Sequence, residues 1–184
     1  MPKNEFLKTI KCYLADEEAT IALAKELAPM LCGTHPILGA QYRGGRIHLK
    51  GDLGAGKTSF ARALLRAAGI TGRIKSPSFA LLESYNLSSL YFYHLDFYRF
   101  RDSREWVDAG FREILQKEAV VLIEWPEQAG ALLPPPDLEI SLSYLENGRL
   151  ACLTAYSTRG QLWLTTLPSP PPECPKKDNP AAAS

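Results

Sequence analysis

The chain has 184 residues, of which 46% are hydrophobic and 22% charged, and its net charge is +1. These values are typical of soluble globular proteins and exclude fibrous and disordered classes, so we expect one domain with one core. The near-neutral charge provides no general field that could hold RNA by counterion release. Because the sequence lacks a signal-peptide pattern and any run of ~18 apolar residues, we expect a cytoplasmic protein without a membrane span.

The cysteines and histidines are too widely spaced to predict a metal centre. No two cysteines form a C-x-x-C pair, and the histidines form no cluster. We therefore expect no zinc or dithiol site, and no disulfides in a cytoplasmic chain. The residues concerned are Cys12, Cys32, Cys152, Cys174, His35, His48 and His94.

The amino-terminal part of the chain predicts a strand, a helix, a loop and a second strand. Residues 9–14 have a β-like pattern, and Asp16 follows with a carboxylate that can cap a helix. Residues 33–45 are rich in Gly and Pro and are expected to form a loop, whereas residues 46–50 are expected to form a short strand. The helix has apolar residues at helical spacing, namely Ala19, Leu23, Leu27 and Leu31.

The middle of the chain predicts a helix, a hairpin and a buried strand. Residues 59–68 favour a helix that Gly69 ends. Residues 80–85 and 90–96 are rich in aromatic and apolar side chains on either side of a turn-prone Asn-Leu-Ser-Ser sequence, which indicates a hairpin. Residues 119–124 are a short apolar, β-branched run, typical of a strand that is buried on both faces.

The last part of the chain predicts further strands and a tail. Residues 137–144 and 149–156 flank an Asn-Gly turn, which indicates a hairpin, and residues 161–166 are expected to add one more edge strand. Residues 168–184 are Pro-rich and polar, so we expect a disordered tail. We therefore predict one P-loop ATPase domain in residues 1–167. Its expected fold is α/β, a P-loop NTPase-like three-layer sandwich with a mixed, mainly parallel central sheet and late antiparallel hairpin strands.

A complete G-x-x-x-x-G-K-[ST] motif lies between a predicted strand and a predicted helix, which is the context that a P-loop requires. Its glycines let the backbone wrap around phosphate oxygens, and the helix amino terminus offers free N–H groups. Lys57 can reach the β and γ phosphates, and the Thr58 hydroxyl can bind Mg²⁺. Since the chain lacks the N-K-x-D element of GTPases, ATP is the expected nucleotide. The motif comprises Gly51, Asp52, Leu53, Gly54, Ala55, Gly56, Lys57 and Thr58.

Two acidic residues at predicted strand ends are candidates for work on the phosphates. Glu124 ends one strand and Asp96 ends another. The carboxyl ends of strands in α/β sheets open on the ligand crevice, so either carboxylate could contact the metal or the attacking water.

An aromatic-rich segment, residues 85–111, also contains Arg99 and Arg101. This combination could stack nucleic-acid bases. Packing in the core and at the sheet edge is the simpler interpretation, and we prefer it. The aromatic residues include Tyr91, Phe92, Tyr93, Phe97, Tyr98, Phe100 and Trp106.

Four motifs follow one another along the chain: GDLGAGKT at 51–58, KSPSFALLESY at 75–85, HLDFYRF at 94–100 and LIEWPEQ at 122–128. In this order they resemble the bacterial tRNA threonylcarbamoyladenosine biosynthesis ATPases, the TsaE or YjeE family, and the likeness runs from about Cys12 to Leu167. It implies a small Mg²⁺- and ATP-dependent P-loop ATPase that joins two proteins, a transferase subunit and its paralogous scaffold subunit. Together they modify adenosine 37 of tRNAs that read codons beginning with A. Because this chain is near neutral, we expect the partners to hold most of the tRNA.

The resemblance also implies roles for individual residues. Lys57 and the P-loop backbone bind the ATP phosphates, and Thr58 and Glu124 hold Mg²⁺. Asp96 falls on a family acid needed for hydrolysis, so the implied catalytic residues are Lys57, Glu124 and Asp96. Trp125 falls on an aromatic residue beside the metal site.

Further nucleotide-binding positions follow from the same likeness. Ser76, Pro77 and Ser78 match a switch-like loop over the phosphates, although the family usually has Thr at the position of Ser78. Asp16 and Glu17 lie where the family approaches the nucleotide from the amino-terminal side. Residues 33–45 resemble an insertion, and the tail is also extra, so both affect expectations about partner contacts more than about chemistry.

Two alternatives remain open from the sequence. A small-molecule P-loop kinase would share the core, and residues 94–104 could serve as its basic lid. A nucleotide-binding module without hydrolysis is the second alternative. Phosphate transfer to a metabolite would indicate the kinase, and a lack of ADP release would indicate the binding module.

Overall fold

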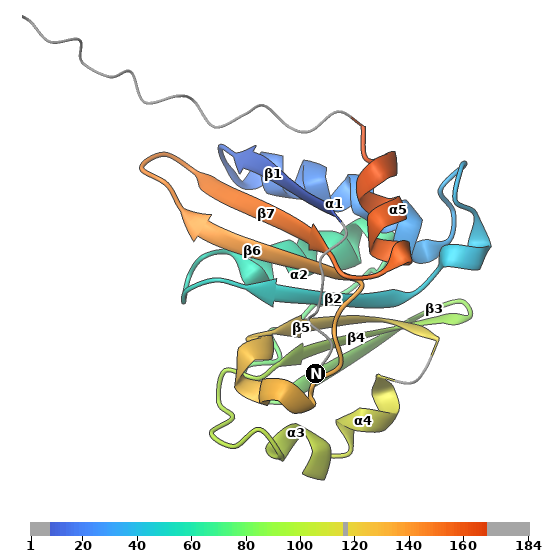
Figure 1. Ribbon diagram of the computed structural model, residues 1–184. Coiled ribbons are helices and arrows are strands. Elements are labelled where there is room, and N and C mark those ends of the chain that lie inside the picture. The colour runs from blue at the N-terminus through green and yellow to red at the C-terminus, as the bar shows by residue number, and fades with distance from the viewer. Residues whose placement is uncertain (1–7, 116–117, 169–184) are drawn as a thin grey trace, which may run out of the picture.

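A seven-stranded sheet runs through the described part of the chain, residues 8–115 and 118–168 of a computed structural model (Figure 1). The strand order is β1-β7-β6-β2-β5-β4-β3. The strands are β1 (Lys8–Leu14), β2 (Gly45–Lys50), β3 (Leu82–Leu87), β4 (Leu90–Asp96), β5 (Ala119–Glu124), β6 (Leu138–Tyr144) and β7 (Arg149–Ala155).

The sheet is parallel in its centre and antiparallel at its edges. Strand β2 pairs in parallel with β5 and β6, and β5 pairs in parallel with β4. The β6–β7, β1–β7 and β3–β4 pairs are antiparallel. It follows that β1, β2, β4, β5 and β6 run in one direction and only β3 and β7 run in the other. The predictions of a mixed, mainly parallel sheet and of the two hairpins are confirmed.

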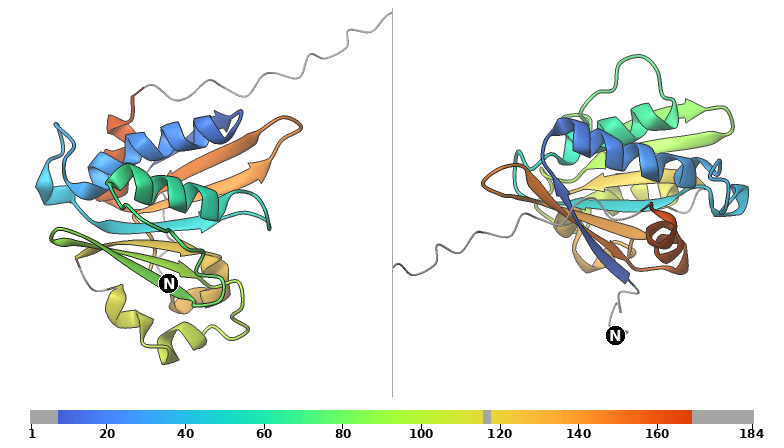
Figure 2. Two further views of the ribbon diagram at one scale, coloured as in Figure 1. Left: turned by 180° about the vertical axis from the view of Figure 1, so that it is seen from behind. Right: turned by 90° about the horizontal axis from the view of Figure 1, so that it is seen from above.

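Helices cover both faces of this sheet. Figure 2 shows α1 (Glu17–Cys32) and α2 (Lys57–Ala68) side by side over one face. The opposite face near β4 and β5 packs against α3 (Glu105–Asp108), α4 (Phe111–Ile114) and the 3-10 segment η2 (Pro126–Leu132). The remaining elements are the 3-10 turn η1 (Ala40–Tyr42), within the predicted loop 33–45, and α5 (Thr158–Thr166).

Strand β5 divides the hydrophobic core in two because its side chains alternate between the faces. Val120 and Leu122 join the core under α1 and α2, whereas Val121 and Ile123 join the core with α3, α4 and η2. Every residue of β5 is buried. The prediction of a strand buried on both faces is confirmed.

Most of the aromatic segment packs in the second core. Phe97, Phe100 and Trp106 are buried there, and the rings of Phe97 and Phe100 stack with centroids 4.9 Å apart. Tyr91 and Tyr98 are about half exposed. The preferred interpretation of this segment as packing in the core and at the edge is therefore confirmed.

The capping signals act as the sequence predicts. Asp16 is the N-cap of α1, where its Oδ1 accepts a hydrogen bond of 2.8 Å from the backbone N–H of Ala19. Such a cap contributes about 1 kcal/mol to stability. Gly69 ends α2 in the left-handed conformation, φ 105°, with its N–H directed to the last carbonyls of the helix.

The prediction of an edge strand at residues 161–166 is wrong, because this segment lies in α5. The Ser157 side chain caps the helix by accepting a bond of 3.1 Å from the N–H of Gly160. Gly160, Trp163 and Leu164 are buried, which is the i, i+3, i+4 spacing of one helix face. The position beside β7 is instead occupied by β1. Capping and packing therefore outweigh the β propensity of Thr and Trp in this segment.

Two expectations concern the ends of the chain and the membrane. Apart from Pro168, the predicted tail lies outside the described residues, so the division at residue 167 stays a prediction. Within residues 8–115 and 118–168, no helix combines the length and the apolar character needed to cross a bilayer.

Candidate active site

The P-loop joins the end of β2 to the start of α2, and close contact with β6 requires two of its glycines. Gly51 has φ 133°, and a Cβ there would collide with the carbonyl oxygen of Leu142. Gly54 has φ 79°, and a Cβ there would lie 2.6 Å from the Tyr144 hydroxyl oxygen. That hydroxyl donates a hydrogen bond of 3.0 Å to the carbonyl of Leu53. Strand β6 therefore supports the loop from behind.

Lys57 is buried inside this loop. Its Nζ donates hydrogen bonds to the carbonyl oxygens of Gly51 at 2.5 Å and Asp52 at 2.8 Å, and it lies 3.9 Å from the centroid of a Trp125 ring. Burial lowers the pKa of the Lys57 ammonium. Four carboxylates act in the opposite direction, those of Glu124, Glu127, Asp96 and Asp52. The ammonium group is thus held where the loop curves, against an acidic end of the sheet.

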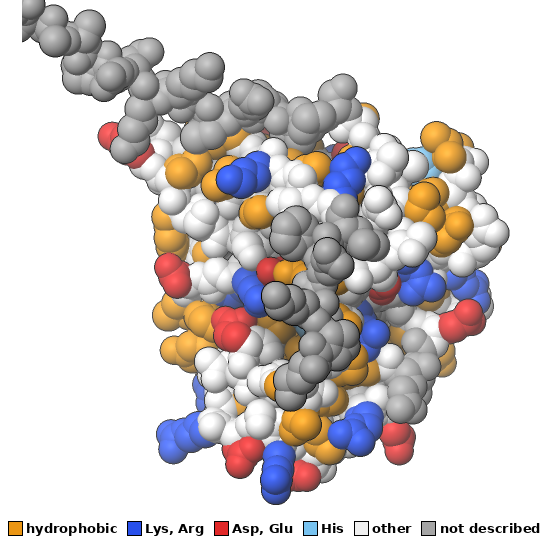
Figure 3. Space-filling view, in the orientation of Figure 1, with side chains coloured by type: hydrophobic (Ala, Val, Ile, Leu, Met, Phe, Trp, Pro, Cys, Tyr) orange, Lys and Arg blue, Asp and Glu red, His pale blue; other side chains and the backbone are white. Residues whose placement is uncertain are grey.

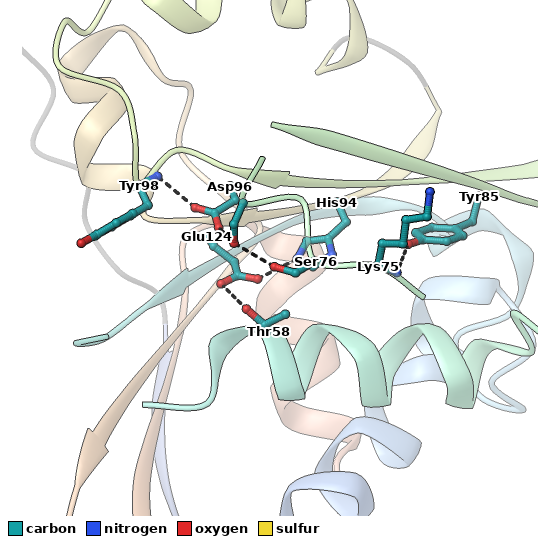
Figure 4. A network of polar contacts seen from close by, with 9 residues as sticks. Thr58, Lys75, Ser76, Tyr85, His94, Asp96, Tyr98 and Glu124 are labelled. Atoms are coloured by element: carbon teal, nitrogen blue, oxygen red, sulfur yellow. Dashed lines mark hydrogen bonds and ion pairs between the residues drawn. The ribbon is translucent and has the colours of Figure 1, made fainter. Parts of the chain in front are cut away.

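A chain of hydrogen bonds links α2 to β5 and β4 (Figure 4). Thr58 Oγ1 donates to Glu124 Oε2 at 2.9 Å. The other oxygen, Oε1, is 2.8 Å from His94 Nε2. Glu124 and His94 are both buried, so the carboxylate is desolvated but has a hydrogen-bond partner on each oxygen.

Asp96 forms a second group beside the first. Its Oδ2 accepts a hydrogen bond of 2.9 Å from Ser78 Oγ, which is 2.8 Å from Ser76 Oγ, and its Oδ1 accepts one of 2.9 Å from the N–H of Tyr98. In the β4–β5 register Asp96 is directly opposite Glu124. The two predicted acids therefore end neighbouring strands, and Asp96 is tied to the loop that contains Ser76 and Ser78.

Trp125 has an unusual backbone that directs its ring. It follows β5 with φ 55° and ψ 49°, in the left-handed region that bulky residues avoid. Its N–H donates to the carbonyl of Leu49 at 3.3 Å, and its ring lies 5.1 Å from that of Tyr98. The turn places the indole over Lys57, at the edge of the phosphate loop.

A cavity of about 560 Å³ opens between the P-loop, the start of α1, the exposed side of α2 and the β6–β7 hairpin. Asp16 and Glu17 line it together with Gly54, Ala55 and Gly56. The Asp16 carboxylate also caps α1, so part of its hydrogen-bonding capacity is used by the helix. A cavity of this volume fits a nucleoside-sized group next to a phosphate cradle.

The fold brings the predicted site residues together at one end of the sheet. Lys57, Thr58, Glu124, Asp96 and Trp125 meet there with Ser78, and Asp16 and Glu17 border the adjoining cavity. Sequence reasoning missed His94. A signal was available, because His94 is two residues before Asp96 on the same strand and must share its face.

Thr58 and Glu124 are a suitable pair for Mg²⁺. A hydroxyl and a carboxylate oxygen 2.9 Å apart are the hard ligands that this ion takes, and it usually adds phosphate oxygens and water. Among the described residues there is no group of three or more His, Cys, Asp or Glu side chains that could hold a metal without such additions. The donor set therefore fits a cation that arrives with phosphate.

Comparisons with known proteins place the chain in one family. A family model described as threonylcarbamoyl adenosine biosynthesis protein TsaE matches residues 14–151. The tRNA threonylcarbamoyladenosine biosynthesis protein TsaE of Haemophilus influenzae is 32% identical over 155 residues, which cover 84% of this chain and 95% of the relative. The protein of that name from Bacillus subtilis is 35% identical over 134 residues, with coverages of 73% and 77%.

A solved structure supports the same relationship. The crystal structure of YdiB from Bacillus subtilis aligns with a TM-score of 0.69 at 30% identity. The alignment covers 89% of this chain and 96% of that chain. The predicted P-loop NTPase-like fold is thereby confirmed.

Proposed function

We propose that this chain, which belongs to the TsaE family of threonylcarbamoyl adenosine biosynthesis proteins, hydrolyses ATP. The hydrolysis would drive the formation of threonylcarbamoyladenosine in tRNA. The observation that carries the proposal is the meeting of Lys57, Thr58, Glu124 and Asp96 where α2 begins and β4 and β5 end. A cation, two potential metal ligands and a second acid are the groups that hydrolysis of a phosphoanhydride needs.

Phosphate binding is proposed for the P-loop and Lys57. The P-loop leads into the amino terminus of α2, and the free amide groups of a helix start favour negative charge. The Lys57 ammonium would exchange its bonds to two backbone carbonyls for stronger, charge-assisted bonds to phosphate oxygens. The two bonds from Lys57 to backbone carbonyls support this proposal, because they already hold the ammonium group within the loop.

Thr58 and Glu124 are proposed to hold Mg²⁺. When bound, the ion would neutralise charge on the β- and γ-phosphate oxygens. Thr58 would offer its hydroxyl oxygen, and Glu124 would offer Oε2, the oxygen that now accepts from Thr58.

Asp96 is proposed to orient the attacking water. Its carboxylate is held by the Ser78 hydroxyl and the Tyr98 N–H, and it lies beside Glu124 in the sheet. Ser78 belongs to the proposed switch-like loop, so movement of that loop would change the hydrogen bonding of Asp96. This provides a route by which hydrolysis and loop position can depend on each other.

The nucleoside is proposed to occupy the cavity at the start of α1. Glu17 lines the cavity with an exposed carboxylate, which can accept from a ribose hydroxyl or an exocyclic amine. Asp16 would contribute mainly through the helix end that it caps.

Transfer chemistry and most tRNA binding are proposed to belong to two partner proteins, a transferase subunit and its paralogous scaffold subunit. The net charge of +1 supports this division. In Figure 3, basic and acidic side chains intermingle along the lower edge, where α3 and α4 lie, so that edge of the visible face has no single-sign patch. The proposed location is the cytoplasm.

The test is reconstitution of tRNA modification with the two partners, using wild-type protein and Glu124→Ala. We expect wild-type protein to support repeated rounds with slow ATP hydrolysis when alone, and the variant to stop after about one round. Equal numbers of modified tRNAs per complex would show that hydrolysis at this site does not drive the cycle. Transfer of phosphate to a metabolite in place of ADP and phosphate release would instead establish the kinase alternative.

A further inference from the structure

His94 is a fully buried polar residue that none of the roles above uses. It lies on β4 and shares the α2-facing side of the sheet with Phe92, whose side chain is in the core under α1 and α2. Its Nε2 is 2.8 Å from Glu124 Oε1 (Figure 4). Its Nδ1 is buried and has no hydrogen-bond partner among the described residues.

The partners of the ring determine which nitrogen donates. A carboxylate only accepts hydrogen bonds, so the hydrogen between His94 and Glu124 belongs to Nε2 of the imidazole. A hydrogen on Nδ1 would be a buried donor without an acceptor, which is more costly than an unused lone pair. The arrangement therefore favours the tautomer in which Nε2 donates to Glu124.

This single bond orients the carboxylate. With Oε1 engaged by His94, the plane and direction of the Glu124 head group are set from one side, and Oε2 faces Thr58 Oγ1 at 2.9 Å. Without the imidazole, the bond from Thr58 would be the one hydrogen bond left on this carboxylate among the described residues, and that bond is exchangeable. Groups that orient ligands in this way often change metal affinity as much as a direct ligand does.

We propose that His94 is a positioning residue that holds Glu124 with Oε2 directed at the Mg²⁺ site. The inference rests on the proposed function, because the magnesium role of Glu124 is itself part of that proposal. The inference nevertheless makes a prediction of its own. Loss of Nε2 should weaken the binding of divalent cations, whereas nucleotide binding in the absence of metal should not change. A histidine that only filled the core would affect stability alone.

Three variants test the proposal. His94→Leu keeps most of the volume and removes the donor, whereas His94→Gln keeps an amide donor at nearly the place of Nε2. The matched control is His48→Leu, which changes the other buried histidine of the central strands, on the opposite face of the sheet. Each protein is titrated with ADP in EDTA, and then with Mn²⁺ in the presence of ADP, using electron paramagnetic resonance to count free ions.

We expect ADP binding in EDTA to stay within about twofold for every variant. The Mn²⁺ dissociation constant should rise roughly 10- to 100-fold for His94→Leu, return most of the way for His94→Gln, and stay unchanged for His48→Leu. Equal Mn²⁺ affinity of His94→Leu and the wild type would overturn the proposal. If the wild-type protein bound neither ADP nor Mn²⁺, the proposed function itself would fail.

A measurement on the wild type covers the case in which His94→Leu does not fold. Long-range ¹H–¹⁵N correlation of the His94 ring reports which nitrogen carries the hydrogen. We expect protonated Nε2, with a signal that changes when Mn²⁺ or Mg²⁺ is added with ADP. A ring protonated on Nδ1 alone could not donate to Glu124, and that result would overturn the proposal without any variant.

Discussion

The two faces of the sheet each bury a histidine on a strand next to β5, and these histidines are in contrasting surroundings. His94 on β4 faces α2 and is hydrogen-bonded to Glu124. His48 on β2 lies on the other face, and within residues 8–115 and 118–168 its Nε2 has no hydrogen-bond partner. Desolvation, with the nearby charges of Arg46 and Lys50, lowers the pKa of His48 to about 3. Burial of a histidine is therefore not by itself a sign of function. The two histidines differ in that Nε2 of His94 has a carboxylate partner and Nε2 of His48 has no partner among the described residues.

The acids of the two faces differ in the same way. On the second face Glu139 is neutralised by the Lys50 ammonium at 2.8 Å, and both groups reach solvent. On the first face Glu124 is held by a hydroxyl and an imidazole, which are partners that a metal ion or water can replace or accompany. Among the described residues, Glu139 is therefore paired with a lysine, whereas Glu124 has no Lys or Arg ion pair. The predictions below test that difference, starting with the largest effect.

Glu124→Ala should abolish most ATP hydrolysis, with a fall of about 1,000-fold, because losing a metal ligand removes several kcal/mol of transition-state stabilisation. Nucleotide binding should remain appreciable, since the phosphate loop is intact. Phosphate release at saturating ATP measures the first effect and titration the second. Glu139→Ala is the control from the opposite face and should change hydrolysis less than about twofold. Normal ATP turnover by Glu124→Ala would contradict the metal role of Glu124 and indicate Asp96 as the metal ligand instead.

Lys57→Ala should weaken ATP binding by roughly 100-fold, since charge-assisted bonds to phosphate contribute about 3 kcal/mol. The control is Lys50→Ala, seven residues earlier, whose side chain pairs with Glu139 away from the P-loop. We expect that control to bind ATP as the wild type does. Isothermal titration calorimetry measures the ATP affinity of both variants. Similar ATP affinities of Lys57→Ala and Lys50→Ala would contradict the P-loop assignment.

His48 should make stability depend on pH. Its pKa is lowered by folding, so the unfolded chain takes up a proton near pH 6.5 while the folded chain does not until about pH 3. Stability should therefore fall as pH decreases between these values, by roughly 1 kcal/mol per pH unit. We expect urea unfolding between pH 7 and pH 4 to show that the free energy of unfolding depends less on pH in His48→Leu than in the wild type. The same pH dependence in both proteins would mean that folding does not lower the pKa of His48.

Removal of residues 168–184 should have the smallest effect, since this segment is expected to belong to neither face. A Pro-rich polar segment buries little apolar surface, so we expect the melting temperature to change by less than about 2 °C. Differential scanning fluorimetry is sufficient. A loss of many degrees would show that the segment packs on the domain.

Local patterns determined much of this protein from the sequence alone. The P-loop has its chemistry in eight consecutive residues, and the strand 119–124 and the Asp16 cap are equally local, so each could be predicted without knowing its neighbours. The acids Glu124 and Asp96 could be proposed because they end predicted strands, and parallel strands end at a common edge.

Only the tertiary structure decided which distant residues touch. Thr58 and Glu124 are 66 positions apart, and His94 and Glu124 are 30 apart, so their hydrogen bonds depend on β4 and β2 both flanking β5 in one particular register. The same holds for residues 161–166, which lie in α5, while β1 from the other end of the chain pairs with β7. Strand order and register arise from packing of the whole core, and no window of neighbouring residues contains that information.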